Sequence, residues 1–150
     1  MTRGLLGTQA TLVADLNLIL QIIILAVLAI SVFEGRRRGM DHGRMLVTAA
    51  VAINAVLIIA VMNPSFFRIL PFALHNPGAR GPRVVWPHVV LGTLAELIGV
   101  YVVLSANLNS ARPLRLQPTT LTTRAAFRVM FLLWMVALAL GLMIYSVLYM

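Results

Sequence analysis

Four long stretches of the chain are apolar and almost free of charge, and this pattern restricts the possible folds more than any other feature. They cover residues 11–33, 42–62, 86–106 and 123–149. A helix needs about 20 mainly apolar residues to cross the hydrocarbon core of a bilayer. We therefore expect a single all-α domain over residues 1–150, an integral membrane four-helix bundle in contact with the lipid bilayer.

The charged residues support this interpretation by their number and their placement. Only 11% of the residues are charged, whereas soluble domains carry about 25%. The 12 basic residues are all arginine and flank the apolar stretches, which is typical of helix ends at lipid headgroups. The net charge of +8 is therefore assigned to the membrane surface, and we expect no nucleic acid partner.

Arginine placement also predicts the orientation. Eight arginines lie in or beside the first and third loops, and four lie on the other side. The first group is Arg36, Arg37, Arg38, Arg44, Arg112, Arg115, Arg124 and Arg128, and the second is Arg3, Arg68, Arg80 and Arg83. Because loops rich in Arg tend to stay in the cytoplasm, we expect both termini and the second loop to face outward.

Prolines indicate where the helices begin and end. Since proline cannot continue the helical hydrogen-bond ladder, we expect the second helix to end at Asn63-Pro64. Residues 64–85 combine four prolines with large apolar side chains, which favours a short interfacial segment on the membrane surface. Pro87 is expected in the first turn of the third helix, where proline is tolerated.

Several kinds of chemistry are excluded by absent residues and motifs. The chain has no cysteine, which excludes disulfides, thiolate metal sites, iron–sulfur clusters and covalently attached c-type haem. It has no phosphate-binding glycine loop, no HExxH motif and no nucleophile elbow. We therefore predict that the protein is not an enzyme and has no catalytic residue.

The third apolar stretch carries the clearest candidate for function. His88, Gly92, Glu96 and Gly99 are spaced by four, four and three residues, so they share one helical face. Glu96 would lie about 12 Å deeper than His88, where an ionisable group indicates function by default. Two interpretations remain open: Glu96 is a proton-relay acid or lies beside a cofactor, or it is neutral and hydrogen-bonded to a neighbouring helix.

The histidines suggest one ligand set. His42 opens the second stretch on the cytoplasmic side and His88 opens the third on the outer side, separated by most of the hydrocarbon thickness of about 30 Å. His75, in the second loop, lies on the same side as His88. This pair, together with Asp15, is the predicted set for haem b or a copper ion.

Basic residues between the first two stretches form a second candidate region. Arg36, Arg37 and Arg38 follow the first stretch, and His42 and Arg44 open the second. We interpret them as anchors at the lipid headgroups. The alternative is a docking patch for acidic lipid or a partner.

The segments DHGRMLVTAAV and WPHVVLGTLAEL, which open the second and third helices, resemble the small membrane proteins of the YozB/CtaM type, known as domain of unknown function 420. The matching positions are His42, Arg44, Met45 and His88, and the resemblance covers about residues 12–149. The histidines that this family tends to carry at the end of helix 2 and the start of helix 4 are absent here.

The resemblance implies a role in the assembly or maturation of haem–copper terminal oxidases. We therefore predict an accessory subunit or assembly factor of a respiratory membrane complex, with other membrane subunits of that redox complex as partners, in a prokaryotic cytoplasmic membrane. Two alternatives remain open: a small b-type cytochrome that uses His75 and His88, and a proton- or solute-conducting protein that uses Glu96.

Overall fold

The structure is a computed structural model that describes residues 5, 7, 10–37, 40–76, 78–110 and 120–149. Every regular element in this part of the chain is a helix. The elements are α1 (Leu12–Arg37), α2 (Met40–Leu57), the π-helix η1 (Ile58–Met62), α3 (Asn63–His75), α4 (Arg80–Ser110) and α5 (Thr120–Tyr149).

Four helical spans within the described residues are long and apolar enough to cross a membrane. They are Leu12–Val32, His42–His75, Pro82–Leu108 and Ala125–Val147. The chain is therefore an all-α multi-pass membrane protein, and the fold class expected from the four apolar stretches is confirmed.

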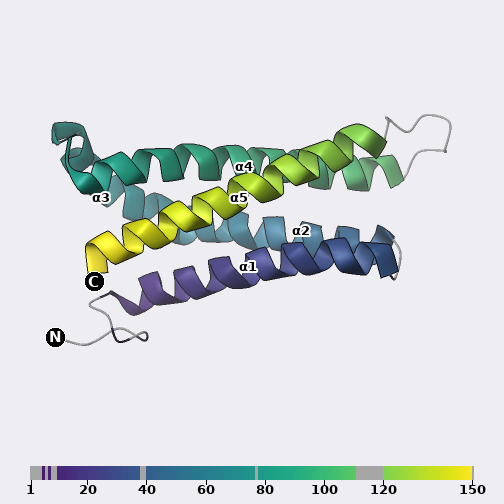
Figure 1. Cartoon of the computed structure of the whole chain (residues 1–150), viewed down its shortest axis with the longest axis horizontal. Helices are drawn as coiled ribbons and strands as arrows, with labels where there is room; N and C mark the ends of the chain where they lie inside the picture. Colours follow the sequence, from purple (N-terminus) through teal and green to yellow (C-terminus); the bar gives the residue numbers. More distant parts are fainter. Residues whose placement is uncertain are drawn as a thin grey trace.

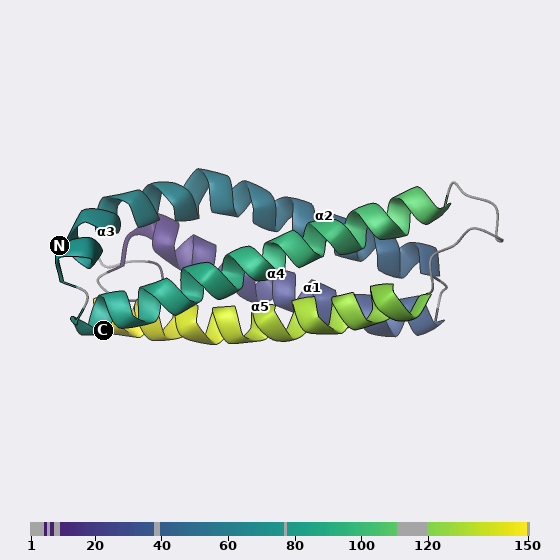
Figure 2. The same ribbon diagram turned by 90° about the horizontal axis from the view of Figure 1, so that it is seen from above.

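The helices form two pairs, with α1 packed along α2 and α4 packed along α5 (Figure 1). Figure 2 shows α4 crossing the bundle diagonally, and α4 also packs against α2. The start of α1, the end of α5, α3 and the start of α4 all lie at one end of the bundle, which we call the terminal end. The end of α1 and the start of α2 lie at the opposite end.

A cluster of buried apolar side chains fills the core, and we call it the apolar core. Every helix of the two pairs contributes to it. Its buried members are Ile24, Leu28, Val47, Ala50, Val51, Ala95, Val102, Met130 and Trp134. Leu28 and Met130 are fully enclosed. Moving an apolar side chain from lipid into the bundle gives no hydrophobic free energy, because lipid tails are equally apolar. Close packing therefore holds such helices together.

The expectation that the second helix ends at Asn63-Pro64 is wrong. The chain stays helical through η1, where the Asn63 N–H donates to the Ile58 carbonyl oxygen, five residues earlier. This wider turn brings Pro64 into the first turn of α3, where its missing N–H costs least. Residues 64–75 of the expected interfacial segment are thus helical and continuous with α2, whereas residues 80–85 belong to α4. Figure 2 shows the long run from α2 to α3 bending. The interfacial position of the segment stays a prediction.

Helix α4, which corresponds to the third apolar stretch, also begins earlier than the sequence suggests. Because α4 starts at Arg80, Pro87 lies inside the helix and not in its first turn. Pro82 lies in that first turn instead, where the N–H groups have no partner within the helix. Likewise α1 extends to Arg37 and α2 begins at Met40, so the expected first loop is shorter, and residues 38–39 lie outside the described residues.

Candidate functional site

Three polar side chains from three helices meet inside the bundle. Asn54 of α2 donates its amide hydrogen to Glu96 Oε2 of α4, with an N–O distance of 2.7 Å. Gln21 of α1 donates to Asn54 Oδ1, also at 2.7 Å. We call Gln21, Asn54 and Glu96 the mid-membrane network, because it joins α1, α2 and α4 through a single chain of hydrogen bonds.

The depth of this network follows from its place on the spans. Gln21 lies at the centre of Leu12–Val32, and Glu96 lies at the centre of Pro82–Leu108. Asn54 must lie at the same level, since it bonds to both. At this depth little water is available to replace a lost partner, so a polar group is best satisfied by another helix. Asn54 satisfies both Gln21 and Glu96, and only 2% of its own surface is exposed.

Two buried oxygen atoms near this level have no hydrogen-bond partner. They are Glu96 Oε1 and Asn17 Oδ1. Asn17 lies one helical turn from Gln21, toward the terminal end, so the two α1 side chains share a face. A buried acceptor without a donor is uncommon and calls for an explanation.

His88 lies toward the terminal end of α4 and faces α5. Its Nδ1 is 2.8 Å from the Ala137 carbonyl oxygen, which fixes a hydrogen bond between the two helices. A Cβ added to Gly141 would lie 3.2 Å from His88 Cε1, so α5 presents a glycine where the imidazole packs. His88 and Glu96 both contact other helices, but His88 contacts α5 whereas Glu96 contacts α2.

The two glycines on the predicted face of α4 differ. A Cβ on Gly99 would lie 3.2 Å from Val51 Cγ2 and 3.3 Å from Met130 Sδ, whereas a Cβ on Gly92 would meet nothing within 4 Å. Small residues on a membrane-spanning face usually allow close helix packing, and α4 packs in this way at Gly99 but not at Gly92.

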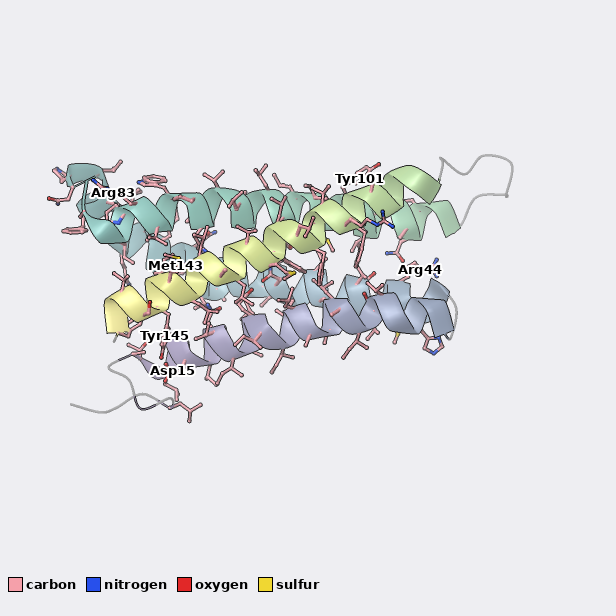
Figure 3. All side chains as sticks on the ribbon, viewed as in Figure 1. Asp15, Arg44, Arg83, Tyr101, Met143 and Tyr145 are labelled. Carbon is pink, nitrogen blue, oxygen red and sulfur yellow. The ribbon has the colours of Figure 1, made fainter. Side chains whose placement is uncertain are left out.

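The predicted metal set is not assembled. Asp15 is fully buried and accepts a hydrogen bond from the Tyr145 hydroxyl (Figure 3). His75 is exposed at the end of α3, with Nδ1 2.7 Å from the Pro71 carbonyl oxygen. In the part of the chain that the structure describes, no group of three or more His, Asp or Glu side chains could hold a metal ion. Haem binding by His75 and His88 stays a prediction.

The basic region between α1 and α2 is described only in part. His42 is exposed and Arg44 is half-buried, and Figure 3 shows Arg44 and Arg83 toward different ends of the bundle. The side chains of Arg36 and Arg37 and the whole of Arg38 lie outside the described residues. Their role as lipid or partner contacts stays a prediction.

A pocket of about 230 Å³ lies between α3, α4 and α5. Its lining is apolar apart from one arginine: Arg68, Ile69, Phe72, Pro82, Val84, Val85, Ile144 and Val147. It lies away from the mid-membrane network and contains no side chain that could serve as a general acid or base.

The sequence pattern indicated Glu96 and His88 but did not indicate the partners that hold them. Asn54 is the missing residue, and its signal is a lone amide within an apolar helix. Such a group must find a partner on another helix. Tyr145 lies four residues from both Gly141 and Tyr149, a spacing that indicates only a packing face of α5, but its hydroxyl also bonds to Asp15.

Comparison of the chain with models of known protein families, with curated proteins and with solved structures finds no match. The resemblance to the YozB/CtaM type thus gains no support from these comparisons and stays a prediction.

Proposed function

We propose that the chain is a small non-catalytic membrane subunit or assembly factor of a larger membrane complex. The observation that carries this proposal is that most of the inward polar groups form hydrogen bonds from one helix to another. The mid-membrane network links α1, α2 and α4. Asp15 and Tyr145 link α1 to α5, and His88 links α4 to α5 through Ala137. A bundle fixed in this way suits an anchor or scaffold.

The outer surface supports the same proposal. Large apolar side chains are exposed on all four spans, among them Ile23, Val56, Leu97 and Leu132. Gly92 leaves open space on α4, and its neighbour Thr93 is exposed. A surface of this kind accommodates lipid chains or the helices of other membrane subunits.

The nature of the complex rests on the resemblance alone. By that resemblance, the partners are subunits of a haem–copper terminal oxidase in a prokaryotic cytoplasmic membrane. The conducting alternative has less support, because the apolar core fills the bundle between the mid-membrane network and the opposite end. No line of polar side chains crosses that half among the described residues.

The test is purification of the intact protein from its native membrane in a mild detergent, with mass spectrometry of the chains that copurify. We expect oxidase subunits and their haem absorption to copurify with the wild type. Asn54→Leu, which loosens the bundle, should reduce the recovered partners at least fivefold, and Asn107→Leu serves as the control near the opposite end.

Two outcomes would count against the proposal. Recovery of the protein alone and colourless, in a gentle preparation that keeps other membrane complexes intact, would remove the subunit function. A Soret band that stays with the isolated chain and is lost in His88→Ala would favour the cytochrome alternative instead.

A further inference from the structure

Polar side chains inside the bundle are distributed unevenly along its length. The inward polar side chains that lie between the mid-membrane network and the terminal end come from three helices. They are Asp15 and Asn17 on α1, His88 on α4, and Tyr145 on α5. From the network to the opposite end, the interior is filled by the apolar core.

The polar groups in the opposite half do not form a path to the network. The buried Ser31 hydroxyl donates to the Leu28 carbonyl oxygen of its own helix. Asn107 donates to Thr48 near the end of α4 and is exposed. Between these groups and Glu96 lie Val51, Val102 and Met130, all buried. The bundle therefore has a polar half and an apolar half, and Glu96 lies at the boundary.

The hydrogen bonds of Glu96 define which of its oxygens is open to a proton. Oε2 already accepts the Asn54 amide hydrogen, whereas Oε1 is buried and has no partner. A carboxylate left charged at this depth is costly, and a neutral carboxylic acid costs far less. A proton on Oε1 would supply a donor, and the buried Asn17 Oδ1 is an acceptor that has no donor.

We propose that Glu96 binds a proton at Oε1 and exchanges it with water only through the polar half, from the terminal end. Asn17 Oδ1, a buried acceptor without a donor one helical turn from Gln21, lies on that side of the network. The exchange is a simple proton transfer, in which a carboxylate and a proton give a carboxylic acid. This proton site needs no partner subunit, so it goes beyond the proposed subunit function.

The titratable groups around this site are few. Inside the bundle toward the terminal end they are Asp15 on α1, His88 on α4 itself and Tyr145 on α5. Arg83 of α4 is exposed and Tyr149 of α5 is half-buried at the same end, and Tyr101 of α4 and Arg128 of α5 are exposed in the opposite half. On α2 the described titratable side chains are His42 and Arg44, both at the opposite end. On α3 they are Arg68 and His75, and both are exposed. The inward groups that could carry a proton between Glu96 and water thus lie on the terminal side.

Infrared spectroscopy of the intact protein in lipid tests whether Glu96 takes up the proton. We expect a carbonyl band of a protonated carboxylic acid at about pH 6–7, where a free glutamate is ionised, and Glu96→Gln should remove it. Gln keeps the shape and an acceptor for Asn54, so this variant retains the fold. Asp15→Asn is the matched control and should leave the band in place. If no band in this range depends on Glu96, the proposal is overturned.

Cysteine labelling tests the direction of access, because the chain has no cysteine of its own. Asn17 and Val47 each lie five residues inside a span, at the terminal and the opposite end respectively. We expect a hydrophilic maleimide to modify Asn17→Cys at least tenfold faster than Val47→Cys in the folded protein. Equal rates, or a faster reaction at Val47→Cys, would overturn the one-sided access even if Glu96 binds a proton.

Discussion

At the scale of single residues, Asn54 makes it possible for Glu96 to lie inside the bundle. Its amide group both donates and accepts, so it satisfies Glu96 on one side and Gln21 on the other. Asn54 itself is almost completely buried. Removing one member of such a set leaves its partners unsatisfied in the interior, whereas removing the whole set does not.

This asymmetry predicts the effect of Asn54→Leu. The variant should lower the free energy of unfolding by about 1–3 kcal/mol, because Glu96 loses its donor and Gln21 loses its acceptor. The triple variant Gln21→Leu, Asn54→Leu, Glu96→Leu should recover most of this loss. Denaturant titration in mixed micelles measures both values.

Asn107→Leu is the control for this prediction. Asn107 also bonds across helices, to Thr48, but it is exposed, so its replacement should change stability by less than about 0.5 kcal/mol. If Asn54→Leu costs no more than Asn107→Leu, the mid-membrane network does not stabilise the bundle.

The Asp15–Tyr145 hydrogen bond gives a second residue-level prediction. Tyr145→Phe removes one hydroxyl and should cost about 1–2 kcal/mol, since Asp15 is fully buried. Tyr149→Phe is the matched control, because Tyr149 packs its ring against Tyr145 at a centroid distance of 5.2 Å. Equal stability of the two variants in the same titration would contradict a stabilising role for the bond.

At the scale of elements, α4 shows which features follow from sequence and which depend on packing. The spacing of His88, Glu96 and Gly99 predicts an inward face, and these residues do contact other helices. The spacing gives no means of telling Gly99, which touches Val51, from Gly92, which touches nothing. That difference depends on the angle at which α4 crosses its neighbours, which a pattern within one helix does not contain.

The two glycines therefore form a matched pair for a test. Gly99→Ala should destabilise the protein by about 1–2 kcal/mol, because its Cβ would press on Val51 and Met130. Gly92→Ala should stabilise it by about 0.5–1 kcal/mol, since alanine favours the helix and has room. Thermal unfolding in detergent compares them, and a change of the same sign in both variants would argue against the close approach at Gly99.

The prediction that Pro64 ends the second helix is wrong for a different reason. Pro64 normally stops a helix, but the π-turn of η1 moves the hydrogen bonds by one residue before the proline is reached. The residues of Ile58–Met62 are ordinary apolar ones, so their sequence does not predict a π-turn. The number of spans was predictable because it depends on length and hydropathy, whereas this boundary depends on the geometry of a single turn.

At the scale of the whole molecule, the four spans bring the start of α1 and the end of α5 to the same end of the bundle (Figure 1). That arrangement follows from an even number of crossings and was predictable from the sequence. The partners of Glu96 were not, because they depend on the rotation and register of three helices at once. Which end faces the cytoplasm rests on the arginine distribution alone.

The orientation prediction can be tested at the two ends of one span. Asn76 follows the span His42–His75 at the terminal end, and His42 begins it at the opposite end, and both side chains are exposed. With the terminal end outward, an impermeant maleimide should label Asn76→Cys in intact cells or spheroplasts, and His42→Cys only after the membrane is opened. Because the two positions lie at the two ends of the same helical run, unequal expression or folding of separate segments would not produce this pattern. The reverse pattern would place the terminal end in the cytoplasm, and the proton site at Glu96 would then open to the cytoplasm.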